Sequence, residues 1–223
     1  MHWLPPQAST FASEIDFMFW VILVITGIAF VIVEVGLLWF VIRYRHRPDR
    51  RAYYTHGSKT AEIIWTAIPA ATVIVLGVWS GRVWGEIKRR DRLPANAVRV
   101  AIAAKQFEWN VTYAGADGVL GTPDDFTVRN QLHVPVDRPV VVDLTAEDAI
   151  HSFFVPVFRL KQDAVPGMRI PVWFEATQVG EYEIACAELC GLGHYRMRGM
   201  VHVHTQEDFD RWMLARAAGG EGR

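Results

Sequence analysis

Two cysteines, one histidine and one methionine gather within twelve residues of this chain. They lie in Cys186-Ala-Glu-Leu-Cys190-Gly-Leu-Gly-His194-Tyr-Arg-Met197, and no other cysteine occurs in the protein. Sulfur and imidazole ligands favour copper or zinc over magnesium or calcium. Cys190, His194 and Met197 are the ligand types of a blue-copper site, which also needs a second histidine. Cys186 is then one thiolate more than a single copper uses.

His151 is the best candidate for the second histidine. It lies in Glu147-Asp-Ala-Ile-His151-Ser-Phe-Phe-Val-Pro156, 35 residues before Cys186, and we expect a turn between strands there. A ligand on one loop and a ligand cluster on another are a common way to assemble a metal site in an all-β domain. The residue types leave two other uses of the thiols open. One is a Cys186–Cys190 disulfide, which suits an extracytoplasmic protein, and the other is a structural zinc site.

Two long apolar runs precede this part of the chain. Residues 17–42 carry a single charge, Glu34, and are long enough to span a bilayer with some tilt. Residues 63–81 carry none and contain Pro69, which we expect to kink the helix. The sequence therefore predicts an exposed N-terminal arm (1–16) and a transmembrane helical hairpin (17–93) with helices near 17–42 and 61–84. Glu34 is expected to bond to a neighbouring helix or subunit.

The charges bear on the surroundings of each half. Residues 1–93 hold 11 Lys and Arg against 7 Asp and Glu, whereas residues 94–223 hold 12 against 17. The loop between the apolar runs is strongly basic, which is typical of a cytoplasmic loop. A similar number of basic residues follows the second apolar run, so charge alone does not fix the orientation. An even number of spans puts both termini on one side, and the thiols and imidazoles would suit a metal site outside the cell. We therefore predict an integral protein of a bacterial inner membrane or its equivalent, with both termini on the outer, periplasmic side. The basic residues cluster beside the apolar runs and not on a face rich in aromatic residues, so the sequence does not indicate nucleic acid as a partner.

From Pro94 onward the pattern changes to short β-rich runs separated by turn residues. Many short strands at this spacing indicate a sandwich or a Greek-key barrel. Thr205 is suited to cap a final helix within this domain, 94–217, and the Gly-rich tail 218–223 is expected to be disordered. The acidic stretch 117–125 is better explained as a hairpin turn than as a calcium loop. The predicted strands include 98–102, 128–134, 140–144, 170–174, 182–184 and 200–204.

Three motifs resemble subunit II of the haem–copper cytochrome c oxidases. They are Ile150-His-Ser-Phe-Phe-Val-Pro156, Phe158-Arg-Leu-Lys-Gln-Asp-Ala-Val-Pro-Gly167 and the cluster from Cys186 to Met197, and the likeness extends over residues 15–215. The resemblance implies a two-helix transmembrane hairpin plus an all-β, cupredoxin-like Greek-key barrel. It also implies a binuclear copper centre, called CuA, in the barrel.

By this resemblance the additional thiolate has a role, because both cysteines bridge both copper ions. Each copper then receives one imidazole, and a thioether and a main-chain carbonyl are weak outer ligands. The side chain of Glu188 is implied to reach a magnesium site shared with subunit I. The implied metal residues are His151, Cys186, Glu188, Cys190, His194 and Met197.

Two further positions take a role from the resemblance. Glu62 begins Glu-Ile-Ile-Trp-Thr, a motif that lies at the mouth of a proton pathway in this family, although residue chemistry alone favours a simple acid at a helix N-terminus. A tryptophan receives the electron from cytochrome c in the family. Phe107 stands at that position here and Trp109 matches the next aromatic residue, so these two are the expected route inward.

The implied function is electron transfer within an oxidase complex. The chain would accept electrons from cytochrome c and pass them to haem in subunit I, where oxygen is reduced to water with proton pumping. No Cys-x-x-Cys-His is present, so we expect a separate cytochrome c and no catalytic residue in this chain. The partners implied are subunit I, other oxidase subunits and the lipid membrane. The alternatives are a stand-alone, membrane-anchored copper protein or the copper domain of another respiratory reductase, and the hairpin and Glu62 argue against both.

Overall fold

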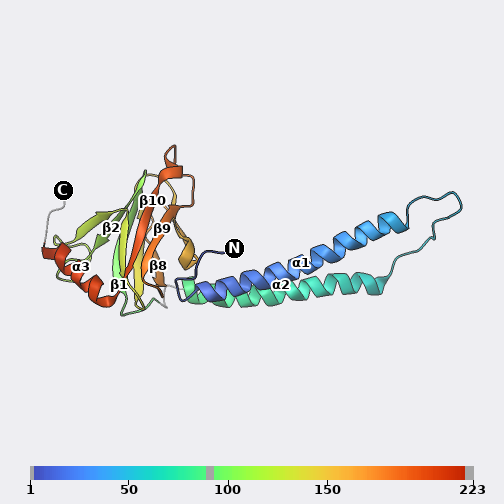
Figure 1. Ribbon diagram of the computed structural model, residues 1–223, viewed down its shortest axis with the longest axis horizontal. Helices are drawn as coiled ribbons and strands as arrows, with labels where there is room; N and C mark the ends of the chain where they lie inside the picture. The colour runs from blue at the N-terminus through green and yellow to red at the C-terminus, as the bar shows by residue number, and fades with distance from the viewer. Residues whose placement is uncertain (1–2, 89–92, 219–223) are drawn as a thin grey trace. The chain divides into compact units, whose positions relative to one another are not determined.

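The computed structural model describes residues 3–88 and 93–218 and separates into two compact units (Figure 1). One unit spans residues 16–86, and the other combines residues 1–15 with 87–223. Of the predicted tail, only Ala218 is described, as the last residue of the final helix. The remainder of the tail lies outside the described residues.

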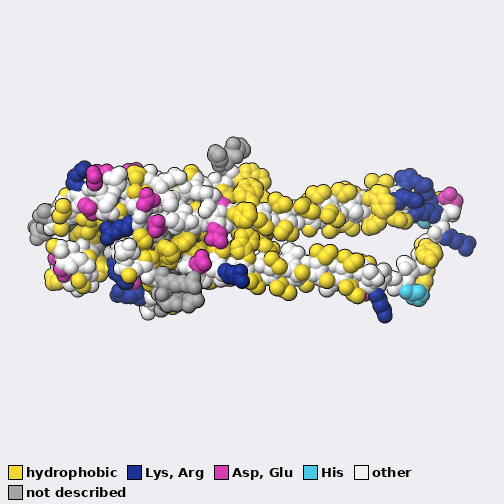
Figure 2. All heavy atoms as spheres, turned by 90° about the horizontal axis from the view of Figure 1, so that it is seen from below, with side chains coloured by type: hydrophobic (Ala, Val, Ile, Leu, Met, Phe, Trp, Pro, Cys, Tyr) yellow, Lys and Arg dark blue, Asp and Glu magenta, His cyan; other side chains and the backbone are white. Residues whose placement is uncertain are grey.

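The first unit is built from two long apolar helices. Helix α1 spans Ala12–Arg43 and helix α2 spans Lys59–Lys88, so both are longer than predicted, and α2 continues through Pro69. The ring of Phe17, near the start of α1, lies 5.7 Å from that of Trp79, near the end of α2, as expected for antiparallel neighbours. Hydrophobic side chains cover both helices, and Lys and Arg gather at the connecting loop (Figure 2). Both helices are long and apolar enough to cross a membrane, and their apolar side chains are exposed as lipid contact would require.

The second unit is a sandwich of two five-stranded sheets. Their strand orders are β3-β2-β1-β5-β8 and β4-β10-β9-β6-β7. Strand β1 pairs in parallel with β5, and β4 with β10, while all other pairs among the named strands are antiparallel. The strands are β1 Val98–Lys105, β2 Glu108–Tyr113, β3 Phe126–Arg129, β4 Gln131–Pro135, β5 Pro139–Ala146, β6 His151–Val155, β7 Leu160–Ala164, β8 Ile170–Glu175, β9 Gly180–Cys186 and β10 Arg198–His204.

The core follows from alternating side chains along these strands. In β1 and β2 every second residue is buried, as expected for strands with one face on a core. Burial of this apolar surface is the main stabilising contribution to the sandwich. The largest fully buried side chains are those of Trp109, Tyr113, Phe153, Phe158 and Phe174.

Two strand predictions need correction. The run 128–134 is not one strand, because Asn130 adopts a left-handed conformation (φ 58°) and separates β3 from β4, which belong to different sheets. Asparagine tolerates this conformation better than most residues. The Asn130 side chain also accepts a hydrogen bond from the backbone N–H of Trp109 (2.8 Å). His151 is likewise not in a turn but is the first residue of β6.

The N-terminal segment is bound to the sandwich, so the prediction of an exposed arm is wrong for Ala8, Ser9 and Ala12. Ala8 and Ala12 are fully buried. The Ala8 backbone N–H donates to the Val157 carbonyl (3.0 Å), and the Ser9 hydroxyl donates to the Phe158 carbonyl (2.8 Å). Small side chains allow this close approach. The segment forms backbone hydrogen bonds to the sandwich that its sequence does not predict.

The chain ends in helix α3, Gln206–Ala218. Thr205 caps it as predicted, because its hydroxyl accepts a hydrogen bond from the Asp208 backbone N–H (3.2 Å). On its inner face, Trp212 stacks on the His133 ring with centroids 4.1 Å apart. The helix therefore packs onto β4 through an aromatic pair.

Candidate metal centre

Strand pairing brings the two distant parts of the predicted cluster together. His151 begins β6 and Cys186 ends β9, and these strands are antiparallel neighbours with Phe153 opposite Cys186. The connection from β9 to β10 carries the other predicted ligands and contains the short 3-10 helix η3, His194–Arg196. All of these residues therefore meet at one end of one sheet.

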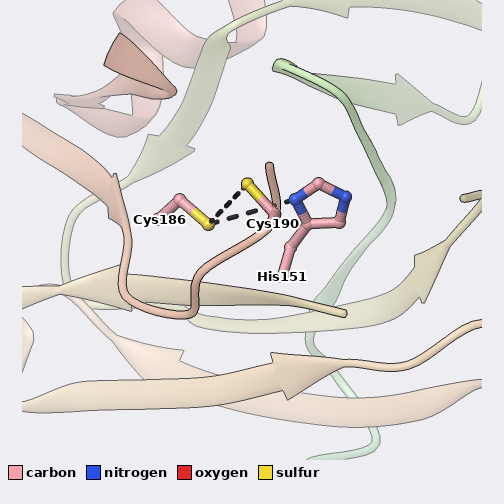
Figure 3. Close-up of side chains that lie close together, drawn as sticks. All are labelled: His151, Cys186 and Cys190. Carbon is pink, nitrogen blue, oxygen red and sulfur yellow. Dashed lines mark hydrogen bonds between the residues drawn. The ribbon is translucent and has the colours of Figure 1, made fainter. Parts of the chain in front are cut away.

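The two thiols face each other and a histidine. Cys186 Sγ lies 3.8 Å from Cys190 Sγ and 3.9 Å from His151 Nδ1 (Figure 3). All three side chains are buried. A disulfide needs sulfur atoms about 2.05 Å apart, so the cysteines are not bonded to each other.

The second histidine and the weaker donors complete the group. His194 Nδ1 lies 3.6 Å from Cys190 Sγ, and Met197 Sδ lies 3.8 Å from the same sulfur. The main-chain carbonyl of Glu188 lies 3.3 Å from Cys186 Sγ. The structure thus brings together all six residues that the sequence predicted for the metal site.

The donor set fits copper better than zinc. Two thiols and two imidazoles would already satisfy a tetrahedral zinc ion. Met197 is almost fully buried, and its thioether is directed at Cys190 Sγ, where zinc would give it no role. Thioether ligation is a preference of copper. Burial, together with the neighbouring Cys186, raises the pKa of the Cys190 thiol to about 11, so a bound metal must displace a proton.

Asp148 orients the His151 ring and was not predicted from the sequence. Its Oδ1 lies 2.9 Å from His151 Nε2, which leaves Nδ1 to face the sulfur atoms. Partial burial opposes ionisation of this carboxyl group. Hydrogen bonds from His151 and from two backbone N–H groups outweigh burial and hold the pKa of Asp148 below its ordinary value. A carboxylate on the distal nitrogen is the usual way to fix a ligating histidine.

The two predicted aromatic residues have different environments. Trp109 is completely buried and lies against His151 (ring centroids 6.3 Å apart) and Phe153 (5.6 Å). Phe107 is only partly buried, in the β1–β2 turn. Its ring covers Gly193, where a Cβ atom would lie 2.5 Å from Phe107 Cδ2. Of the two, only Phe107 reaches the surface.

Glu62 lies in the other unit, in the first turn of α2. Its backbone N–H donates to the Ser58 carbonyl (3.0 Å), which confirms its place at the helix N-terminus. The residues lining a shallow hollow around it are Lys59, Glu62, Ile63, Thr66, Ala67 and Ala70.

Comparison with known proteins identifies the family. Residues 1–83 match the transmembrane domain of cytochrome c oxidase subunit II, and residues 100–204 match its periplasmic domain. The cytochrome c oxidase subunit 2 of Thermostichus vulcanus is 34% identical over 262 residues, which cover 94% of this chain and 77% of that protein. The chain belongs to the cytochrome c oxidase subunit II family.

Other members of the family agree with this assignment. The alternative cytochrome c oxidase subunit 2 of Bradyrhizobium diazoefficiens is 32% identical over 95% of this chain and 83% of its own. The crystal structure of the periplasmic domain of subunit II from Bradyrhizobium japonicum superposes with a TM-score of 0.51 at 26% identity. It covers 58% of this chain and 99% of that domain. The predicted family, the two-part fold and the function as a subunit of a membrane-bound cytochrome c oxidase are therefore confirmed.

Proposed function

We propose that this subunit receives electrons from a separate cytochrome c at a binuclear copper centre and passes them to haem in subunit I. One observation carries the proposal. The two buried sulfur atoms lie 3.8 Å apart, and each faces a different imidazole nitrogen, His151 Nδ1 or His194 Nδ1. This paired arrangement of two thiols and two imidazoles would suit two metal ions, and it leaves neither cysteine surplus.

In this proposal Cys186, Cys190, His151 and His194 would hold the coppers through their thiolates and imidazoles. The Met197 thioether and the Glu188 carbonyl are the weak outer donors. When bound, the coppers supply reversible one-electron transfer. Subunit I carries out the reduction of oxygen to water and the coupled proton pumping.

The protein contributes a fixed and dry surrounding for this chemistry. The thiols and the thioether are buried among residues of the sandwich core, which excludes water from the sulfur atoms. Asp148 holds the His151 ring from its far side. Ligands held in this way move little when the charge of the site changes, and a small rearrangement favours fast electron transfer.

Glu188 can serve two sites at once. Its carbonyl faces Cys186 Sγ, whereas its side chain is exposed. Carboxylate oxygen is a preferred ligand of Mg²⁺. We therefore assign the Glu188 carboxylate to a magnesium site shared with subunit I.

Electrons would enter beside Phe107. This ring is partly exposed and covers the loop that carries Cys190 and His194, whereas Trp109 lies behind it in the core. The acidic balance of residues 94–223 favours a basic donor through long-range steering. Electron transfer should then slow as the salt concentration rises, and a rate that does not change with salt would contradict docking by a free, basic cytochrome.

In this proposal the sandwich and both termini lie on the periplasmic side.

The metal content of the full chain tests the copper centre directly. The chain is purified in detergent, loaded with copper, and examined for copper per chain and by electron paramagnetic resonance. We expect two coppers with one unpaired electron shared between both nuclei. One copper with an unshared electron, or a Cys186–Cys190 disulfide detected by mass, would overturn the proposal. Co-purification with haem absorbance would distinguish an oxidase subunit from a copper protein that works alone.

A further inference from the structure

Gln106 is in contact with both segments that carry the metal residues. It occupies the turn between β1 and β2, far from those segments in sequence. Its backbone N–H donates to Asp148 Oδ2 (2.7 Å), while its side-chain Nε2 donates to the Cys190 carbonyl (2.6 Å). The other Asp148 carboxylate oxygen accepts from His151 Nε2. One residue thus connects the side of the site that carries His151 with the side that carries Cys190.

The loop that Gln106 contacts is rich in glycine, and its other end is held by the Phe107 ring on Gly193 and by helix η3. Between Cys190 and His194 the sequence is Gly-Leu-Gly. Gly191 has a backbone φ of +132°, a conformation that residues other than glycine rarely adopt. A Cβ atom at Gly191 would lie 2.6 Å from Gln106 Nε2. The absence of a side chain at position 191 is therefore what allows the amide to reach the carbonyl of Cys190.

We propose that Gln106 is a positioning residue for the copper centre, which holds Cys190 at its separation from Cys186 before metal binds. This inference rests on the proposed function. A glycine-rich loop loses conformational entropy when a metal fixes it, and that cost lowers the affinity. The amide donated to the Cys190 carbonyl fixes the loop during folding instead. Metal binding then costs less conformational entropy.

The test uses the full chain in detergent and two substitutions of Gln106. Gln106→Leu keeps the side-chain size and the backbone bond to Asp148 but removes the amide donor. Gln106→Glu keeps the shape and also removes the donor. Gln178→Leu is the matched control, because Gln178 Nε2 donates to a backbone carbonyl, that of Gln7 (3.0 Å), which lies on neither metal-binding segment.

Copper affinity is measured by competition with a chelator, the site is followed by its paramagnetic resonance spectrum, and the copper-free chains are melted in parallel. Both Gln106 variants should bind copper about 10–100-fold more weakly, with an altered hyperfine pattern. Their copper-free melting temperatures should fall no further than that of Gln178→Leu.

The inference is overturned if either Gln106 variant binds copper with wild-type affinity and spectrum. It is also overturned if their copper affinity falls only in proportion to a loss of copper-free stability. The wild-type chain separates this result from the proposed function. If the wild-type chain binds no copper pair, the proposed function fails, whereas a wild-type pair with unaffected variants contradicts only the role of Gln106.

Discussion

The indole ring of Trp109 lies against the imidazole of His151, with ring centroids 6.3 Å apart and planes at 66°. Both side chains are completely buried. His151 is therefore held by an aromatic ring on one side and by the Asp148 carboxylate at its distal nitrogen. Trp109, which the sequence places on the expected electron route, thus also packs against a ligand residue of the candidate metal centre.

Removal of the Trp109 side chain should destabilise the fold and loosen the packing around His151. Trp109→Ala is expected to lower the free energy of unfolding by about 3–5 kcal/mol, because it empties a fully buried position. Denaturant titration of the copper-free chain checks this value. Trp109→Phe should cost less, since it keeps a ring beside His151 and loses an indole N–H that has no hydrogen-bond partner in the described part of the chain. A Phe variant as unstable as the Ala variant would contradict a role for the ring itself.

Gly193 and Phe107 should behave as a coupled pair. In Gly193→Ala the new Cβ would lie 2.5 Å from Phe107 Cδ2, so either the ring or the loop must move. We expect a loss of stability of about 1–3 kcal/mol, as for other overpacked positions. Phe107→Leu should recover part of that loss in the double variant.

A double-mutant cycle measures this coupling from the unfolding free energies of the four chains. The coupling energy should reach at least about 0.5 kcal/mol, as for residues in contact. Additive effects of the two substitutions would mean that the steric contact between ring and loop is absent.

His133 should make the stability of the sandwich depend on pH. Burial lowers its pKa to about 3, and nearby positive charge adds to this effect. Because the folded state binds this proton more weakly than the unfolded state, stability falls as pH decreases from about 6.5 toward 3. His133 lies beside two other imidazoles, those of His202 and His204. The charged groups near these three rings are Glu181, Asp208 and Arg216.

The variant His133→Phe keeps a ring to stack on Trp212 and removes the titrating group. Denaturant titrations between about pH 8 and 5 should show a smaller loss of stability in this variant than in the wild-type chain. The slopes should differ by at most about 1.4 kcal/mol per pH unit, the value for one proton. Identical slopes would exclude His133 as a source of the acid sensitivity.

Glu62 provides a prediction for the assembled oxidase. Glu62→Gln removes the ionisable group at the start of α2 but keeps its size and the helix terminus. If Glu62 admits protons, turnover and pumping should slow, while copper content and electron transfer from cytochrome c stay unchanged. Stopped-flow reduction of the copper centre and proton-release assays measure these separately. Thr72→Ala, on the same helix but outside the Glu-Ile-Ile-Trp-Thr motif, is the control.

The metal site was predictable because its chemistry is local in sequence. Five of the six residues lie between Cys186 and Met197, at the end of β9 and on the connection that follows it, and His151 lies in a motif of its own. Asp148 carries a weaker signal, an acid three residues before a histidine. The contact of Gln106 with Cys190 leaves no trace in the sequence, because it depends on how the β1–β2 turn approaches a distant loop.

The fold was predictable where the apolar pattern is strong. The two long helices are continuous apolar runs, and short β-rich runs mark β1, β5, β8 and β10. The boundary between β3 and β4 was missed because apolar residues continue on both sides of Asn130, and only its backbone conformation ends the strand. The N-terminal segment was missed for a different reason. It is bound by backbone hydrogen bonds from Ala8 and Thr10, which do not depend on any side-chain pattern.

The position of β10 bears on when the chain can acquire its metal during synthesis. This strand is the last to be made, yet it lies between β4 and β9 inside its sheet and follows Met197 directly. Until residues 198–204 have left the ribosome and paired, the connection that follows Cys186 and carries Cys190 has no fixed end. The geometry of the candidate metal site is therefore complete only after the last strand of the sandwich has paired. A chain that stops before β10 would lack the strand that follows Met197 and pairs with β9 beside Cys186.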